Sequence, residues 1–348
     1  MRYPDFLGKE GSIGCIAPSF GCATEPYKSA FNHAIKLWTE KFSHQVFLGP
    51  NAMLDAGVGI SNTPKLCGQE IMDYFEDASC DVLISCGGGE LMCEDLDYVN
   101  FEKLKALPPK WFMGYSDNTN LTFLLPTLCD TAAIYGPCAA AFGMEPWHEA
   151  IHDAYALLRG EKLVAHNYGL YEKESLKDEE HPLEPYHVTE KSVIRAFLGE
   201  KEVEKDSPVE FEGRLIGGCM DCLVNLTGTC YDRVKEFADR YEQDGIIWFL
   251  EACDLNVMGI RRAVWQMEHA GWFKNVKGFL VGRPVCHGEE MMGMDQYKAV
   301  LSVIAHYGKP VLMDLDIGHI APMMPLISGG YGKVSYEQGK LSVSMECR

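Results

Sequence analysis

The first half of the chain alternates short apolar runs with longer amphipathic stretches. Short apolar runs that end in Gly, Pro or Ser are typical of buried strands, and an apolar repeat every three or four residues is typical of a helix. The pattern predicts strands at residues 12–18, 45–49, 81–86, 111–115 and 132–137, with helices at about 25–41, 65–78, 118–128 and 146–158. Such alternation indicates a parallel sheet with helices on its faces, in which ligands gather at the carboxyl ends of the strands.

The pattern changes between residues 167 and 208, where the sequence is polar, acidic and interrupted by prolines. We expect a linker or an exposed excursion there. Alternation then resumes, with strands predicted at 213–216, 246–251, 278–281 and 311–314, helices at 220–227, 257–270 and 296–306, and a β-hairpin at the end. The predicted fold class is therefore α/β, with an N-terminal, flavodoxin-like parallel-sheet domain at 1–166, a polar linker at 167–208, and a smaller α/β domain at 209–348 that closes with the hairpin.

A net charge of -19 over 348 residues argues against binding to nucleic acids or to anionic membrane surfaces, because both would repel the protein. No apolar run approaches the length of a membrane span, and the first residues show neither the apolar core nor the cleavage site of a signal peptide. We therefore expect a cytoplasmic protein with a small-molecule partner. The 14 cysteines are scattered, many of them within apolar strands, which favours reduced, buried thiols over disulfides.

One predicted strand ends in Gly114, Tyr115, Ser116 and Asp117, immediately before a predicted helix. A tight turn between a strand and a helix can present a nucleophilic hydroxyl, although the second glycine of the GxSxG motif is missing here. Ser116 or Asp117 could equally cap the helix, since serine, aspartate and asparagine are all good N-caps. The turn by itself leaves both interpretations open.

A serine nucleophile needs a base that removes its proton, and the base needs a partner that fixes its tautomer. His319 is the best placed of the 11 histidines, since it follows a predicted strand and lies in a loop with two prolines. Glu251 ends the most apolar strand of the second half, where a carboxylate is expensive to bury unless it is paired. Each residue also fits a structural role, but with Ser116 they suit a Ser-His-Glu arrangement.

Three glycines, Gly87, Gly88 and Gly89, follow the predicted strand at 81–86. Their amides could approach a ligand closely, as an oxyanion hole or as an anion-binding nest, and the same run could be only a flexible turn. The run is neither a Walker loop nor GxGxxG, so it gives little support to a nucleotide site.

Two features of the cysteines offer other chemistry. Cys86 directly precedes the glycines, and a thiol between a strand and a helix can have a depressed pKa, which would make it a nucleophile. Cys219 and Cys222 form a lone CxxC, without the second pair of ligands at the spacing that a zinc site needs.

Several short segments occur in a familiar order: IAPS at 16–19, CGGGE at 86–90, GYSDNTNL at 114–121, YGP at 135–137, GGC at 217–219, FLE at 249–251 and GHIAPMMPLISG at 318–329. In these segments the sequence resembles the S66 family of serine peptidases, which contains the LD-carboxypeptidases of murein recycling and the microcin C self-immunity proteins. The resemblance extends over about residues 12–344. It is most specific in GYSD and in the segment that begins with GH.

The resemblance implies a catalytic triad of Ser116, Glu251 and His319. It places the nucleophile in the N-terminal domain and the other two residues in the C-terminal domain, so that the site lies at their interface. It also implies a homodimer.

For the oxyanion hole, the resemblance implies backbone amides of Gly88 or Gly89 and of Asp117. Two departures put the substrate in doubt: Cys219 takes the place of the family's common asparagine, and Ala252 that of an acidic residue. The glycine turn looks closer to the microcin-immunity branch than to the murein branch.

We therefore predict an amide hydrolase that acts on a small, anionic, peptide-like substrate, either a murein tetrapeptide or a peptidyl or aminoacyl nucleotide conjugate. No cofactor and no metal are expected. The anionic substrate would need a local cationic pocket, for which Arg261, Arg262, Arg283 and Lys309 are available. The alternatives are an amidotransferase-like enzyme that uses Cys86, and a non-catalytic α/β module that binds an anion.

Overall fold

The chain folds into two units, each built on its own sheet. The computed structural model describes residues 1–204 and 206–348; the first unit comprises Met1–Leu163 and Glu174–His187, and the second comprises Val164–Lys173 and Val188–Arg348. Residue 205, which falls in the predicted linker, lies outside the described residues. The domain boundaries expected at residues 166 and 208 stay a prediction.

The sheet of the first unit is parallel and has the strand order β2-β1-β3-β4-β5. This is the order of flavodoxin-like folds, in which ligands bind at the carboxyl ends of the strands near the point where the order reverses. The predicted α/β class and the predicted parallel sheet are therefore confirmed. The strands are β1 (Ser12–Ile16), β2 (Gln45–Leu48), β3 (Val82–Ser85), β4 (Trp111–Gly114) and β5 (Ala133–Tyr135).

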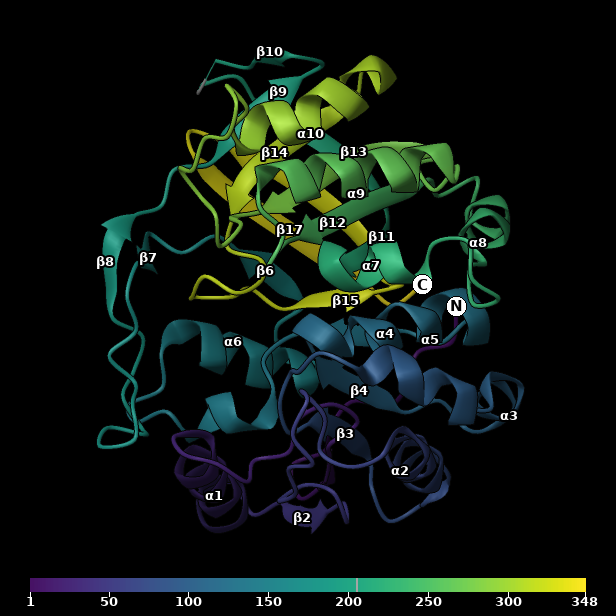
Figure 1. Cartoon of the computed structure of the whole chain (residues 1–348), viewed down its shortest axis with the longest axis vertical. Coiled ribbons are helices and arrows are strands. Elements are labelled where there is room, and N and C mark those ends of the chain that lie inside the picture. The colour runs from purple at the N-terminus through teal and green to yellow at the C-terminus, as the bar shows by residue number, and fades with distance from the viewer. Residues whose placement is uncertain (205) are drawn as a thin grey trace. The chain divides into compact units, whose positions relative to one another are not determined.

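Helices cover both faces of this sheet, with α2 and α3 on one side of β3 and β4 and with α1 and α6 on the other (Figure 1). The sequence pattern missed α3 and the short turn η2, and the helix expected at 118–128 is divided into three pieces. The elements are α1 (Tyr27–Lys36), η1 (Leu37–Lys41), α2 (Pro64–Glu76), η2 (Met92–Tyr98), α3 (Phe101–Ala106), η3 (Ser116–Asn118), α4 (Thr119–Thr122), α5 (Leu124–Cys129), η4 (Ala139–Gly143) and α6 (Glu149–Leu158).

Strand β4 is buried along its whole length, and Trp111, Phe112 and Met113 are each 0% exposed. Phe112 packs in a cluster with residues of α2, α3 and α5, such as Ile71, Leu104 and Leu125. Burying an apolar side chain of this size stabilises a fold by about 1.5–3 kcal/mol. The end of β4, and the turn that follows it, are therefore held on a rigid support.

The second unit contains a nine-stranded sheet with the order β10-β9-β14-β13-β12-β11-β16-β17-β6. The four strands β11 to β14 are parallel, and the flanking strands pair antiparallel. The strands are β6 (Val164–His166), β9 (Arg195–Leu198), β10 (Lys201–Glu202), β11 (Val209–Cys219), β12 (Ile246–Glu251), β13 (Val276–Gly282), β14 (Pro310–Leu315), β16 (Tyr331–Glu337) and β17 (Lys340–Glu346). Strands β16 and β17 form the predicted closing hairpin.

The stretch expected to be a polar linker contains short strands that the sequence pattern missed. Besides β9 and β10, these are β7 (Leu170–Glu172) and β8 (Val188–Lys191), which pair with each other in an antiparallel ribbon. A further short strand, β15 (Leu326–Ser328), precedes the hairpin. Residues 174–187 belong to the first unit, and the other described residues of this stretch belong to the second.

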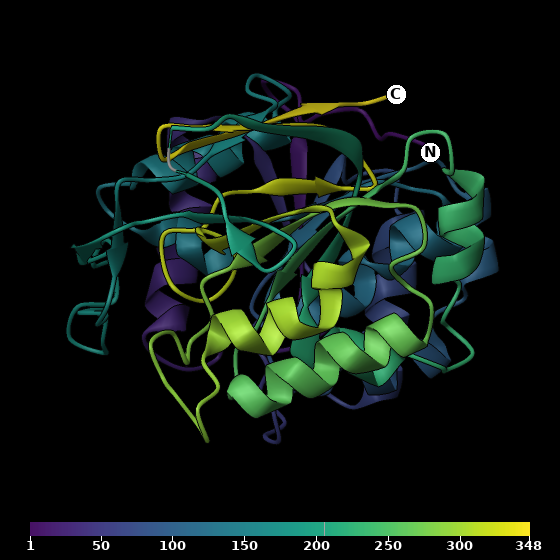
Figure 2. The same cartoon turned by 90° about the horizontal axis from the view of Figure 1, so that it is seen from above.

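Two long helices, α9 and α10, lie side by side over the parallel strands of the second unit, as the green and yellow-green ribbons of Figures 1 and 2 show. The helices of this unit are α7 (Met220–Leu226), α8 (Val234–Arg240), α9 (Val257–His269), α10 (Gln296–Ile304) and the short turn η5 (Ala305–Tyr307). None of the helices within residues 1–204 and 206–348 has the length and apolar character that crossing a membrane would require.

Candidate active site

Ser116 stands in a strained turn directly after β4. Its φ angle is 62°, in the left-handed region that residues other than glycine rarely adopt. Tyr115, just before it, is still extended, and Ser116 begins the 3-10 turn η3. The turn therefore interrupts the path from strand to helix at the serine, which is the geometry that exposes a nucleophilic hydroxyl at the carboxyl edge of a parallel sheet.

The glycine turn after β3 lies against this serine. A methyl group added at Gly88 would come within 3.2 Å of both Cβ and Oγ of Ser116, so the backbone of residue 88 passes close to the hydroxyl. Gly89 lies instead against Ser19, whose Oγ would be 2.2 Å from a methyl group on residue 89. The structure thus brings together the predicted nucleophile and one of the predicted oxyanion glycines.

Asp117 and Asn118 link the serine turn to its neighbours. The Asp117 carboxylate is buried and accepts hydrogen bonds from Ser19 Oγ at 2.5 Å and from the Met92 N–H at 2.9 Å. The Asn118 side-chain amide donates to the carbonyls of Gly87 and Tyr115. The alternative in which Ser116 or Asp117 caps the helix is therefore wrong, since neither η3 nor α4 has a side-chain cap. The side chains of Asp117 and Asn118 instead hold the turn against neighbouring segments.

The strain at Ser116 predicts a gain in stability when glycine replaces it. A left-handed conformation costs an L-residue about 1–2 kcal/mol and costs glycine almost nothing, although the greater freedom of glycine in the unfolded chain offsets part of this difference. We expect the free energy of unfolding of Ser116→Gly to be about 1 kcal/mol higher than that of Ser116→Ala, as measured by urea denaturation.

Ser43 provides the control for this measurement, because it is exposed and has the same φ of 62°. Ser43→Gly and Ser43→Ala should differ by a similar amount. A clear difference at position 43 together with equal stabilities at position 116 would contradict a strained nucleophile turn.

Asp95, in η2, is a buried acid close to the serine turn. It is 0% exposed, and neither carboxyl oxygen has a hydrogen-bond partner among the described residues. Burial, reinforced by the nearby charge of Asp117, raises the pKa of Asp95 from 3.8 to about 9. We conclude that Asp95 is protonated in the folded protein at neutral pH. No local pattern in the sequence predicts this, because Asp95 and Asp117 are 22 positions apart and are neighbours only in space.

This raised pKa predicts how stability depends on pH. Between pH 3.8 and about 9 the folded chain keeps the Asp95 proton while the unfolded chain loses it, so Asp95 makes the protein less stable as the pH rises. We expect Asp95→Asn to increase the free energy of unfolding by on the order of 2–4 kcal/mol at pH 8 and by little at pH 4. Asp97→Asn, an exposed change in the same turn, should be neutral at both pH values. A gain from Asp95→Asn that is equal at pH 4 and pH 8 would rule out the raised pKa.

Glu251 and His319 form a buried pair in the second unit. Glu251 is the last residue of β12 and is 0% exposed, and its Oε2 lies 2.9 Å from Nδ1 of His319, in the loop after β14. Burial lowers the pKa of His319, but the Glu251 carboxylate, with a further contribution from Cys253, raises the pKa well above its ordinary value. Because Nδ1 faces the Glu251 carboxylate, Nε2 is the ring nitrogen that would exchange a proton with a nucleophile. The carboxylate stabilises the ring once it is protonated, as a general base requires.

Two glycines make room for the Glu251 side chain. A methyl group at Gly318, where φ is 104°, would lie 2.5 Å from Glu251 Oε2, and one at Gly282 would lie 3.0 Å from Glu251 Cβ. Any side chain at position 318 would therefore be strained and would displace the carboxylate. The glycine before His319 is a requirement of the Glu251–His319 contact.

The cysteine alternative does not suit the structure. Cys86 is 0% exposed, and burial raises the pKa of its thiol well above the ordinary value. The expectation of a depressed pKa at this position is wrong, because the loss of water outweighs any benefit from the glycine turn.

One of the cations suggested for substrate binding is already engaged. Arg283 is 2% exposed; its guanidinium donates to Asp316 at 3.1 Å and to Ser192 at 2.9 Å, and it lies over the ring of Tyr171. These contacts give Arg283 a structural role within the second unit. Arg261, by contrast, is on the outer side of α9 and donates to the carbonyl of Lys298.

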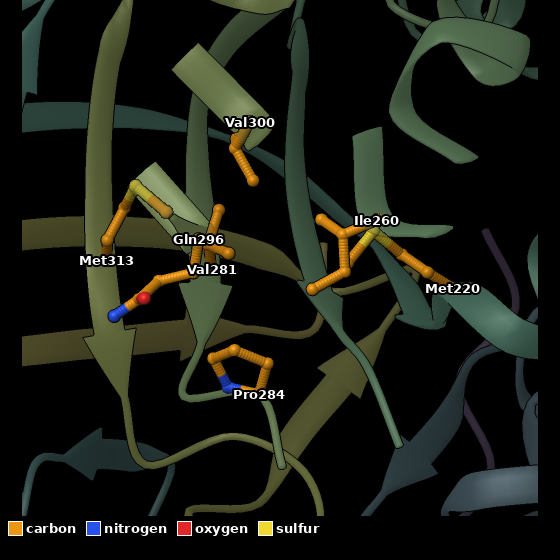
Figure 3. A pocket seen from close by; sticks show the side chains of 8 residues that line it. Met220, Ile260, Val281, Pro284, Gln296, Val300 and Met313 are labelled. Carbon is orange, nitrogen blue, oxygen red and sulfur yellow. The ribbon is translucent and has the colours of Figure 1, made fainter. Parts of the chain in front are cut away.

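A small cavity lies under α9 and α10 in the second unit (Figure 3). It has a volume of about 10 Å³, and apolar side chains such as Met220, Ile260 and Met313 line it. A space of this size holds one water molecule at most. It is a packing defect and not a substrate site.

Two family models match segments of the chain. The family model of the N-terminal domain of the S66 LD-carboxypeptidases matches residues 13–136, and the model of the C-terminal domain matches residues 212–334. The search of curated protein sequences finds no match.

Solved structures with the same fold include the microcin C7 self-immunity protein MccF, as a single-residue variant bound to adenosine monophosphate. It has 20% sequence identity, 99% of each chain covered and a TM-score of 0.79. The same protein has been solved with aspartyl sulfamoyl adenosine, and a triple active-site variant of it has a serine, an asparagine and a lysine changed to alanine. An MccF-like protein from Bacillus anthracis str. Ames has 21% identity, 99% of this chain and 100% of that chain covered, and a TM-score of 0.78.

Proposed function

Because the chain belongs to the S66 family of LD-carboxypeptidases, we propose that it is a serine-type amide hydrolase with Ser116 as nucleophile, His319 as general base and Glu251 as the partner of the base. The observation on which this rests is the 2.9 Å contact between buried Glu251 and Nδ1 of His319. A carboxylate buried at the end of an apolar strand and joined to an imidazole is the arrangement that activates a serine.

In the proposed mechanism, Nε2 of His319 takes the proton of Ser116 Oγ while the oxygen attacks the carbonyl carbon of the scissile amide. Backbone amides of Gly88 or Gly89 and of Asp117 stabilise the oxyanion, and Gly88 is the best supported because it lies against Ser116. His319 then gives the proton to the leaving amine. A water molecule, activated in the same way, releases the acyl group from Ser116.

We propose a peptidyl or aminoacyl nucleotide conjugate as the substrate, because the solved relative MccF binds adenosine monophosphate and an aminoacyl sulfamoyl nucleoside. A murein tetrapeptide is the second candidate, because both matching family models describe LD-carboxypeptidases. At a net charge of -19 either anionic substrate needs a local cation, and Arg283 is engaged elsewhere. We also expect a homodimer, which light scattering of the purified protein would test.

The test is incubation of the purified chain with a panel of murein peptides and peptidyl or aminoacyl adenylate analogues, with products identified by mass spectrometry. Release of an amino acid or an amine from one class, and not from the other, identifies the substrate. A shift in melting temperature without any product would favour the binding-module alternative. Stoichiometric alkylation with loss of activity, together with an inactive Cys86→Ser variant, would favour the cysteine alternative.

A further inference from the structure

Three potential metal ligands of different chemical type meet in the second unit. They are the thiol of Cys219, the carboxylate of Glu251 and the imidazole of His319, and one ligand atom from each lies within 4.8 Å of the other two. Cys219 ends β11 and is the direct neighbour of Glu251 in the register with β12, so the two side chains leave the sheet at the same place. Cys219 is 2% exposed and Glu251 is 0% exposed, so both are shielded from water.

The ligand types favour a thiophilic cation. Zinc binds thiolate sulfur at about 2.3 Å, and imidazole nitrogen and carboxylate oxygen at about 2.0–2.2 Å, in a tetrahedral arrangement. The ligand atoms of such a site are about 3.3–3.8 Å apart. Nδ1 of His319 and Oε2 of Glu251, which are 2.9 Å apart, would therefore separate slightly, and the Cys219 sulfur would approach them by about 1.5 Å at most. Magnesium and calcium prefer oxygen ligands alone, and the thiol therefore selects against them.

The charge beside the cluster also suits a cation, and the fourth position is left to a water molecule, as in other zinc sites with three protein ligands. Asp221 adds a second carboxylate beside the cluster, since its Oδ2 lies 3.3 Å from the Cys219 sulfur. Asp221 is not itself a ligand, because its oxygens already accept hydrogen bonds from the N–H groups of residues 253, 254 and 255.

We propose that Cys219, Glu251 and His319 form a binding site for a thiophilic divalent cation of the zinc type, with water in the fourth position. On binding, the cation displaces the thiol proton of Cys219, which passes to solvent, and the single ring proton of neutral His319 moves from Nδ1 to Nε2. Cys222, the second cysteine of the CxxC, makes a side-chain hydrogen bond with Cys219 but is not one of the three clustered ligands.

Occupation of this site is incompatible with catalysis, and this part of the inference rests on the proposed function. With the cation on Nδ1, the ring proton stays on Nε2, so His319 is unable to accept the proton of Ser116. Glu251 is likewise no longer the partner of the base. The cation would therefore act as a reversible inhibitor of the hydrolase.

Binding is tested without reference to activity. The full chain, kept reduced with a phosphine and freed of metal, is titrated with Co²⁺ while sulfur-to-cobalt charge-transfer absorption is recorded, and Zn²⁺ is then added as competitor. We expect one ion per chain with a tetrahedral spectrum. Cys219→Asn, which introduces the residue common in the family, should weaken binding by about 100-fold or more.

Two variants serve as controls. Cys230→Ser and Cys347→Ser, both at exposed sites, should bind Co²⁺ as the unchanged chain does. Cys219→Ser is the second test variant in case Cys219→Asn does not fold, as judged by circular dichroism. The metal site is overturned by absence of stoichiometric uptake, by equal affinity in the Cys219 variants, or by loss of binding in Cys230→Ser.

Inhibition is a separate measurement. Zn²⁺ should abolish hydrolysis of the best substrate, and a chelator should restore it. Stoichiometric binding without inhibition would leave the site standing and overturn its inhibitory role. If the chain hydrolyses no substrate, the proposed function fails, while the Co²⁺ titration still decides the metal site.

Discussion

Replacing Ser116 by alanine should lower turnover of the best substrate by on the order of 10³-fold or more, with little change in substrate affinity. The reason is that no other hydroxyl takes the place of Ser116 Oγ at the turn after β4, so the covalent step is lost. The backbone amides near Gly88 would stay in place, because alanine removes one oxygen atom only. The measurement is the initial rate of product release, followed by mass spectrometry.

Ser43→Ala is the matched control for this experiment. It removes the same oxygen from a serine with the same φ of 62°, at an exposed position outside the proposed site. Its turnover should equal that of the unchanged chain. A Ser116→Ala protein with full activity would refute the assignment of the nucleophile.

Replacing Glu251 by glutamine should lower turnover by about 10³–10⁴-fold. Glutamine has the same size as glutamate and fits between Gly282 and Gly318. It replaces a carboxylate oxygen, which only accepts hydrogen bonds, with an amide group that can donate one. An amide that donates to Nδ1 of His319 forces the ring proton onto Nε2, and the ring is then unable to accept the proton of Ser116. The change should therefore lower kcat and leave KM nearly unchanged. Nitrogen NMR of the His319 ring should show the proton on Nε2.

Glu210→Gln provides the control, because Glu210 is an exposed carboxylate at the other end of β11, and its loss changes net charge by the same amount. Its turnover should be unchanged. Activity of Glu251→Gln within tenfold of the unchanged chain would contradict the role of Glu251 as partner of the base.

Residues at the ends of strands could be predicted from the sequence because the signals there are local. The apolar run at 246–250 followed by one carboxylate defines β12 and its last residue, Glu251, directly. Ser116 and His319 were found by the same logic, as polar side chains that follow buried strands. Within each parallel sheet, the carboxyl ends of the strands lie along one edge. The order of apolar and polar residues along the chain therefore indicates which side chains lie at that edge.

Contacts between distant segments could not be predicted in this way. Asp117 looked like a helix cap because its actual partners, Ser19 and Met92, are far away in the sequence. The contact of Cys253 with His319 and the burial of Asp95 depend on packing in the same manner. Strand β8 was missed because its sequence, VTEK, has almost no apolar alternation and owes its conformation to pairing with β7.

The left-handed serine after β4 has a consequence for laboratory evolution. Because glycine relieves the strain at position 116, a library screened for heat resistance alone would enrich the very substitution that removes the nucleophile. A screen that alternates between heat and catalytic turnover would keep the serine and recover the lost stability at other positions, and Asp95 is the first candidate. The most active and the most stable sequences of this fold should therefore differ at position 116, with serine in the active ones and glycine in the stable ones.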